Sequence, residues 1–155
     1  MSKYPNSVVP EWAMEEAAAA IQWATQNHPT LGRNGWGYGG GWSDEESVAT
    51  AIAFIDCSGV RVRHNVDRKV TSYSWKHRAE EWGREVGFAP YVANGDMILA
   101  ALWRGVMTRE DVSIGPNAFL ALALPTGAAW LETARGRASD PRRARLSRDR
   151  LKAVR

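Results

Sequence analysis

The last 23 residues constrain the fold of this chain most strongly, because they cannot supply a hydrophobic core. Residues 133–155 hold nine Arg or Lys side chains and two Asp, a net charge of +7. Their apolar residues are too few to hold a helix unless something packs on it. We therefore expect a globular helical domain over residues 1–132, followed by an arginine-rich tail over residues 133–155.

The rest of the chain has the opposite charge. Residues 1–132 hold eleven basic and fifteen acidic side chains, a net charge of −4. A length of roughly 100–150 residues suits one hydrophobic core, so a second domain is not expected. The charge asymmetry is typical of an interaction tail, although a solvated tail, or one that docks on the acidic domain, would have the same composition.

Cys57 is the only cysteine, which excludes an intramolecular disulfide and a metal cage built from thiolates alone. The longest apolar runs, such as Met97 to Trp103, fall far short of the ~20 residues of a membrane span, and no cleaved signal is recognisable. These features predict a cytoplasmic protein without a membrane partner. Cys57 fits a small buried hydrophobe, because it lies near a predicted helix end and beside Asp56.

The clearest helix signal is an apolar stripe in the middle of the chain. Trp75, Ala79, Trp82 and Val86 follow one another at intervals of four, three and four residues. This spacing places them on one buried face of an amphipathic helix. A hydroxyl residue at position 71, 72 or 74 can cap its N-terminus.

Three further helices are expected, over Glu11 to Asn27, Ser43 to Ile55 and Gly95 to Arg104. Ser43 and Glu46 have the spacing of a capping box, and Asn94 is a suitable N-cap for the third helix. Residues 108–111 suggest one more helical turn. Each of these segments is bounded by Pro, Gly or a capping residue.

Strands are expected to be few. Val60 to His64 alternate apolar and polar side chains, as a half-buried strand does. Residues 48–55 and 118–124 allow either a helix or a buried strand, because short apolar runs do not separate the two. The predicted fold class is mostly α, or α+β with a minor hairpin: about five helices, one short strand pair and the tail.

The segment from Gly32 to Trp42 contains six glycines and three aromatic residues. Such a segment forms a loop, which could pack its rings against the body or offer them to a partner. It lacks the strand and the Gly-Lys-Ser/Thr ending of a phosphate-binding loop. Eight tryptophans are many for 155 residues, and Trp favours core edges and interfaces. We therefore expect Trp36, Tyr38 and Trp42 to contribute to partner binding.

His77 and Glu80 are the only residues whose spacing suggests catalysis. Residues three and four apart share a helix face, so His77 could present its imidazole together with Glu80 and Glu81. A metal-assisted enzyme built on His77 and Glu80 is therefore one hypothesis, but no spacing supplies a further ligand. A surface histidine in a hydrogen bond is the simpler interpretation. We assign no catalytic residue, no metal ligand and no cofactor.

The arginine-rich tail makes nucleic-acid binding an alternative function. Guanidinium groups bind phosphate through paired hydrogen bonds, and such contacts are sensitive to salt and indifferent to base sequence. DNA or RNA would be the partner. The residues that we expect to contact phosphate are Arg135, Arg137, Arg142, Arg143, Arg145, Arg148, Arg150 and Lys152.

Three stretches of the chain resemble a pattern in small accessory proteins of bacteriophages and related mobile elements. They are Ser72 to Glu80, Tyr91 to Ala101, and Gly105 followed by Pro116 to Phe119. The resemblance covers about a third of the chain. It implies a phage-like setting, with the host cell cytoplasm or the virion as location, and it implies no catalytic residues.

Within these stretches, polar residues lie at the starts of two neighbouring predicted helices. Tyr73, Lys76, His77, Tyr91 and Asn94 could form a patch for a protein partner or an anion, or could cap and support the helices. We interpret the chain as a non-enzymatic, phage-type accessory protein that binds a host or phage macromolecule. The oligomeric state and the partner's identity are left open.

Overall fold

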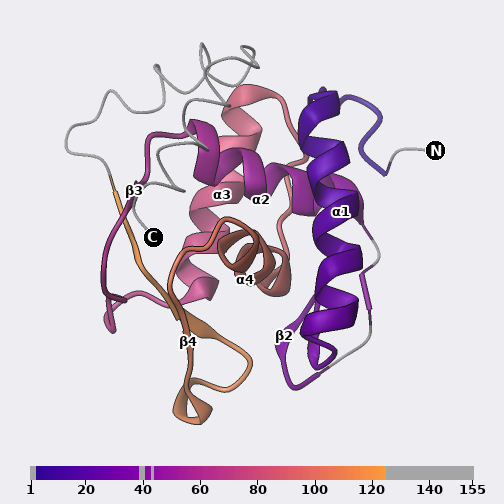
Figure 1. Ribbon diagram of the computed structural model, residues 1–155. Helices are drawn as coiled ribbons and strands as arrows, with labels where there is room; N and C mark the ends of the chain where they lie inside the picture. Colours follow the sequence, from indigo (N-terminus) through magenta and orange to yellow (C-terminus); the bar gives the residue numbers. More distant parts are fainter. Residues whose placement is uncertain (1–2, 39–40, 43, 125–155) are drawn as a thin grey trace.

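The computed structural model describes residues 3–38, 41–42 and 44–124. Four helices form the body of this part: α1 (Glu11–Asn27), α2 (Glu45–Cys57), α3 (Ser72–Val86) and α4 (Asn94–Trp103). Short antiparallel strand pairs lie beside and below the helices, so the fold is α+β with small hairpins (Figure 1). The described residues therefore contain four of the five helices expected, and the arginine-rich tail lies outside them.

The helices pack around α2 and α4, which lie side by side in the middle (Figure 1). The chain is helical from Glu45 to Cys57, which excludes the strand interpretation of residues 48–55, and every residue of α2 from Ser47 to Cys57 is buried. α1 presents a stripe of four buried alanines to α2, whose small side chains allow the two helices to approach closely. None of the helices described here has the length and apolar composition needed to span a bilayer.

The expected stripe on α3 is confirmed. Trp75, Ala79 and Trp82 are buried, and Val86 is partly buried against the same core. The ring of Phe54 on α2 contacts the rings of Trp75 and Trp82, with centroid distances of 6.4 and 6.0 Å. Aromatic pairs in this geometry add to the stabilisation from buried apolar area.

The described residues contain three strand pairs where one was expected. They are β1 (Leu31–Gly32) with β2 (Gly35–Trp36), β3 (Arg61–Val62) with β6 (Leu122–Ala123), and β4 (Thr108–Glu110) with β5 (Ala118–Leu120). All three are antiparallel. The helical turn expected over residues 108–111 is wrong, because these residues pair with β5; a 3-10 turn, Val112–Ile114, follows them.

Two predicted helix caps also need correction. Asp44 caps α2, with its Oδ1 accepting hydrogen bonds from the amides of Glu46 and Ser47. α4 begins one residue earlier than expected, with Ala93 as the N-cap. The Ala93 amide donates to Asp96 Oδ2 at 2.7 Å, which leaves the Asn94 side chain available for contacts outside the helix.

The glycine segment is a hairpin that packs on the start of α4. The Gly95 amide donates to the carbonyl of Arg33, and a side chain at Gly95 would overlap the carbonyl of Gly32. Gly35 has a φ of +113° and lies against Pro116, where a Cβ would meet the Pro116 carbonyl. Only glycine combines this backbone conformation with such close contact, so the loop expected over 32–42 is in part a fixed β1–β2 turn.

Candidate partner-binding site

Four of the predicted partner-binding residues lie together at the start of α3. We name this cluster the tyrosine platform: Tyr73, Lys76 and His77, with Glu80 beneath them and Tyr91 from the segment before α4. Lys76 Nζ lies 5.4 Å from the centre of the Tyr73 ring and 5.2 Å from that of Tyr91. The rings of Tyr73 and His77 meet edge to face at 4.7 Å. The helical spacing brings Tyr73, Lys76 and His77 onto one face.

Glu80 organises the platform, although sequence reasoning considered it only as a catalytic residue. Its Oε1 accepts hydrogen bonds from Lys76 Nζ at 3.0 Å and from the Val92 amide at 3.2 Å. Its Oε2 lies 2.9 Å from His77 Nδ1. One nearly buried carboxylate thereby fixes a lysine, a histidine and the segment that carries Tyr91. Such a shared acceptor holds side chains that would otherwise rotate.

The outer surface of the platform is exposed while its base is not. Tyr73 is 51% exposed and Tyr91 38%, whereas Lys76 and Glu80 are 8% and 7% exposed. Tyrosine offers a rigid apolar ring and a hydroxyl at low cost in conformational entropy, which is why it is enriched in binding surfaces. Lys3 lies 5.7 Å from the Tyr91 ring centre and adds a second cation to the edge.

Asn94, the fifth residue expected in this patch, is built into the packing instead. Its Oδ1 accepts from Ser72 Oγ at 2.8 Å, and its Nδ2 donates to the carbonyls of Asn34 and Pro116 at 3.3 and 3.4 Å. Ser72 Oγ also accepts from the Ala118 amide at 3.0 Å. Asn94 therefore joins α3, α4, the glycine hairpin and β5 into one unit, and the residue is 9% exposed.

The three aromatic residues expected to bind a partner from the glycine segment divide into two groups. Trp36 and Trp42 are partly buried against the core, and the Trp36 ring meets the His28 ring edge to face at 5.5 Å. Tyr38 is 68% exposed, and no ring contact joins it to another described residue. The structure therefore does not bring these three residues to the tyrosine platform.

A buried carboxylate that sequence reasoning missed lies beside the platform. Asp96 is 3% exposed and borders a small hollow together with Asp44, Arg33, Lys3 and Tyr91. Burial raises the pKa of Asp96 to about 7, although its hydrogen bond from Ala93 opposes that rise. The sequence placed Asp96 in the first turn of a helix, which is ordinarily an exposed and ionised position.

A second buried ionic group joins three elements that are distant in sequence. Arg104 donates through Nε and Nη2 to both oxygens of Asp56, at 2.8 and 2.9 Å, and through Nη1 to Glu16 Oε2 at 2.9 Å. Trp103 Nε1 donates to the same Glu16 oxygen at 2.6 Å. Burial opposes the charge on Arg104, but the two carboxylates outweigh it and its pKa is raised. No local pattern in the sequence indicated this group.

The described residues offer little support for the metal-assisted hypothesis. Among them, no group of three or more His, Cys, Asp or Glu side chains is placed to hold a metal ion. His77 and Glu80 do meet, but the oxygens of Glu80 already accept from Lys76, His77 and Val92. Cys57 is buried, in agreement with its interpretation as a core residue.

The predicted phosphate-contacting residues all belong to the arginine-rich tail, which lies outside the described residues. The three stretches that carry the phage-type resemblance meet in space, since Ser72, Asn94 and Pro116 share one hydrogen-bond network. The pattern therefore coincides with residues that hold the fold together. Comparison with models of known families, with curated proteins and with solved structures finds no match for the chain.

Proposed function

We propose that this chain is a non-enzymatic accessory protein of a phage-like setting that binds a host or phage macromolecule through the tyrosine platform. One observation carries the proposal: two exposed tyrosines flank a nearly buried lysine whose position is fixed by Glu80. A platform fixed in this way loses little side-chain entropy when a partner binds. The setting is supported only by the pattern described above.

A protein with hydrogen-bond acceptors on its surface is the partner that this chemistry favours. The platform presents two exposed tyrosines whose hydroxyls can donate hydrogen bonds, above the positive charge of the nearly buried Lys76. Lys3 adds positive charge at the edge. Acidic or carbonyl-rich segments would therefore fit better than basic ones.

Site-specific photocrosslinking tests the proposal. The photoreactive amino acid p-benzoylphenylalanine replaces Tyr73 in the full chain, and the protein is irradiated in cells that carry the corresponding phage or element. The matched control has the same substitution at Val112, which is fully exposed but lies far along the chain on the β4–β5 connection. Protease or nuclease digestion then identifies the crosslinked species as protein or nucleic acid.

The proposal predicts one defined adduct from position 73 that is absent from position 112. The adduct should weaken by roughly tenfold or more with Tyr91→Ala, since removal of a central tyrosine commonly costs about 2 kcal/mol of binding energy. It should persist with Tyr38→Ala. The absence of an adduct at position 73, or the same adducts from both positions, would refute binding by the tyrosine platform.

The composition of the arginine-rich tail supports a second candidate, a protein anchored to nucleic acid. Its nine basic side chains could displace several counterions from DNA or RNA. Affinity for a duplex of random sequence should then fall steeply with salt and vanish when the chain is truncated after Glu132. An affinity with the same salt slope in the truncated chain would exclude the tail as the anchor.

A further inference from the structure

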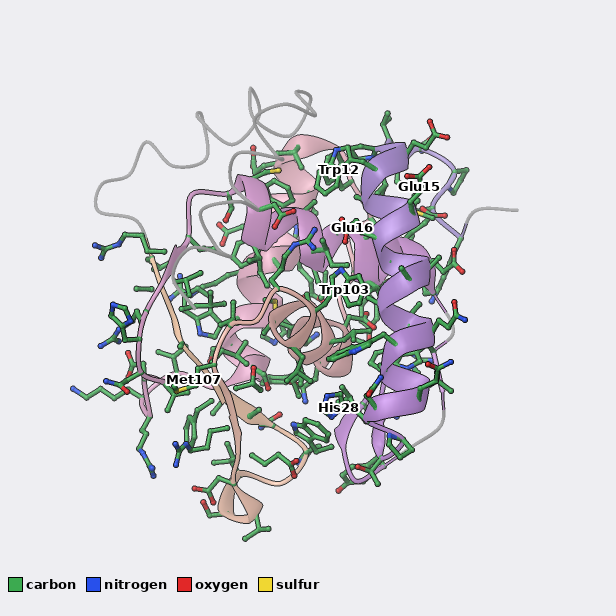
Figure 2. All side chains as sticks on the ribbon, in the orientation of Figure 1. Trp12, Glu15, Glu16, His28, Trp103 and Met107 are labelled. Atoms are coloured by element: carbon green, nitrogen blue, oxygen red, sulfur yellow. The ribbon has the colours of Figure 1, made fainter. Side chains whose placement is uncertain are left out.

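An open groove runs between α1 and the end of α4, and none of its lining residues belongs to the tyrosine platform. It has a volume of about 410 Å³ and is lined by Trp12, Glu15, Glu16, Ala19 and Trp103. Figure 2 shows Trp12, Glu15 and Glu16 along α1, with Trp103 beside them. We name it the tryptophan groove. Its walls combine two large aromatic rings with two carboxylates.

The tryptophan groove has a negative character. α1 carries three glutamates, and its sequence contains no basic residue. Arg104 is the cation beside the groove, but its guanidinium is already bound to both Asp56 and Glu16. Glu15 is exposed, and among the described residues it forms no ion pair. Within the part of the chain that the structure describes, no positive charge at the groove balances the Glu15 carboxylate.

This combination suits an arginine side chain. A guanidinium group stacks on the face of an indole ring, and it pairs with a carboxylate through a planar set of donors. A lysine could also lie over a ring, but it would lack the paired hydrogen bonds. An arginine-containing segment that enters the groove would meet both kinds of partner at once.

The chain itself contains such a segment. The arginine-rich tail holds eight arginines and one lysine among 23 residues. Seventeen residues separate Leu124, the last residue described, from Arg142, and the chain between these two residues can extend over roughly 60 Å. A folded body of about 120 residues has a diameter of roughly 35 Å, so half its circumference is about 55 Å. The tail can therefore reach the tryptophan groove by any path over the surface.

We propose that the arginine-rich tail of each chain docks in the tryptophan groove of the same chain. The opposite charges favour the contact, and the covalent connection raises the effective concentration of the tail to about the millimolar range. A contact of only millimolar intrinsic affinity would thus be occupied about half of the time. The proposal does not depend on the function of the tyrosine platform.

The test places a photoreactive side chain at the groove in the full-length protein. p-Benzoylphenylalanine replaces Ala19, which lines the groove and is exposed. The matched control carries it at Ala18, which is also exposed and lies on the same helix but does not line the groove. Irradiation of a mixture of normal and ¹⁵N-labelled chains, followed by mass spectrometry, shows whether each crosslink joins one chain or two.

Docking predicts crosslinks from position 19 to residues 133–155 of the same chain. Their yield should fall at least about fivefold in 1 M salt, where screening acts over roughly 3 Å, and by a similar factor with Glu15→Lys. Glu81→Lys, an exposed charge reversal on α3, should leave the yield unchanged. Circular dichroism of each variant confirms that the helices are intact.

Three results would overturn the proposal. Crosslinks that join a normal to a labelled chain would show that a second copy, and not the same chain, fills the groove. Equal yields from positions 18 and 19 would show that the tail does not select the groove. An unchanged yield with Glu15→Lys would show that the carboxylate does not recognise the tail.

Discussion

Replacing Arg104 with methionine should destabilise the fold more than any exposed charge substitution. The methionine retains most of the aliphatic volume of the side chain, so the change removes charge and hydrogen bonds with little change in packing. It eliminates the two hydrogen bonds to Asp56 and the one to Glu16. Both carboxylates then lose the cation that compensates for their burial.

The magnitude follows from the exposure of the two acids. The side chain of Asp56 is fully buried, and removing the cation from a buried pair costs about 3–5 kcal/mol. Glu16 is 24% exposed, so water compensates it and its share is roughly 1 kcal/mol or less. We expect the free energy of unfolding to fall by about 3 kcal/mol in total. This value lies at the lower end of the range because the methionine side chain fills most of the space that Arg104 leaves. That corresponds to a fall in Tm of roughly 10 °C.

Urea unfolding of the full chain, followed by tryptophan fluorescence and by circular dichroism, measures the loss. Arg109→Met is the matched control, because Arg109 is exposed on β4 and should change stability by less than about 0.5 kcal/mol. The second arm repeats Arg104→Met in an Asp56→Asn background. There the buried charge is gone, so the cost should fall to about half or less.

Two outcomes would refute this reasoning. A loss below about 1 kcal/mol for Arg104→Met would show that the buried ion group contributes little. An equal loss of stability in the wild-type and Asp56→Asn backgrounds would show that the effect comes from packing and not from the unpaired Asp56 carboxylate. In either case the buried cluster would be incidental to stability.

Three further predictions concern the junction around the start of α4. Gly95→Ala should destabilise the fold by about 2 kcal/mol or more, because the new methyl group overlaps the Gly32 carbonyl. Alanine in place of glycine ordinarily stabilises a helix interior by up to about 1 kcal/mol, so a rise in the urea midpoint would contradict this close contact. Ser72→Ala removes two buried hydrogen bonds and should cost about 2 kcal/mol, while the exposed Ser74→Ala should be near neutral in the same assay. The pKa of Asp96 is about 7 in the folded state, against an ordinary value of 3.8, so folding takes up a proton between these pH values, and stability falls as the pH rises from about 4 to about 7. Asp96→Asn should remove that fall, and equal pH slopes for the two proteins would exclude Asp96 as its source.

Local patterns predicted the helices well because helices are held by contacts between near neighbours. The stripe through Trp75, Ala79 and Trp82 requires only a period of 3.6 residues to be recognised. Gly87 ends α3 in the left-handed conformation that favours glycine, with a φ of +81°. Helix α1 likewise begins directly after Pro10, as expected from its residues.

The strands were predicted poorly for the opposite reason. Thr108–Glu110 form β4 only because Ala118–Leu120 lie beside them, and nothing in the local sequence distinguishes such a segment from a helical turn. The β1–β2 turn contains few residues that favour strands, and it is held by Gly95 and Pro116, which lie far along the chain. Tertiary contacts override weak local preferences in segments this short.

The candidate site shows the same division between features set by local sequence and features set by long-range contacts. The sequence alone determined that Tyr73, Lys76 and His77 share a helix face, since that follows from helical geometry. Only the tertiary structure decided that Tyr91 completes the platform and that the Asn94 side chain is hydrogen-bonded within the fold. It also decided that Arg104 pairs with acidic residues 48 and 88 positions away. Backbone periodicity is a local property, whereas the pairing of buried polar groups depends on which distant segments the core brings together.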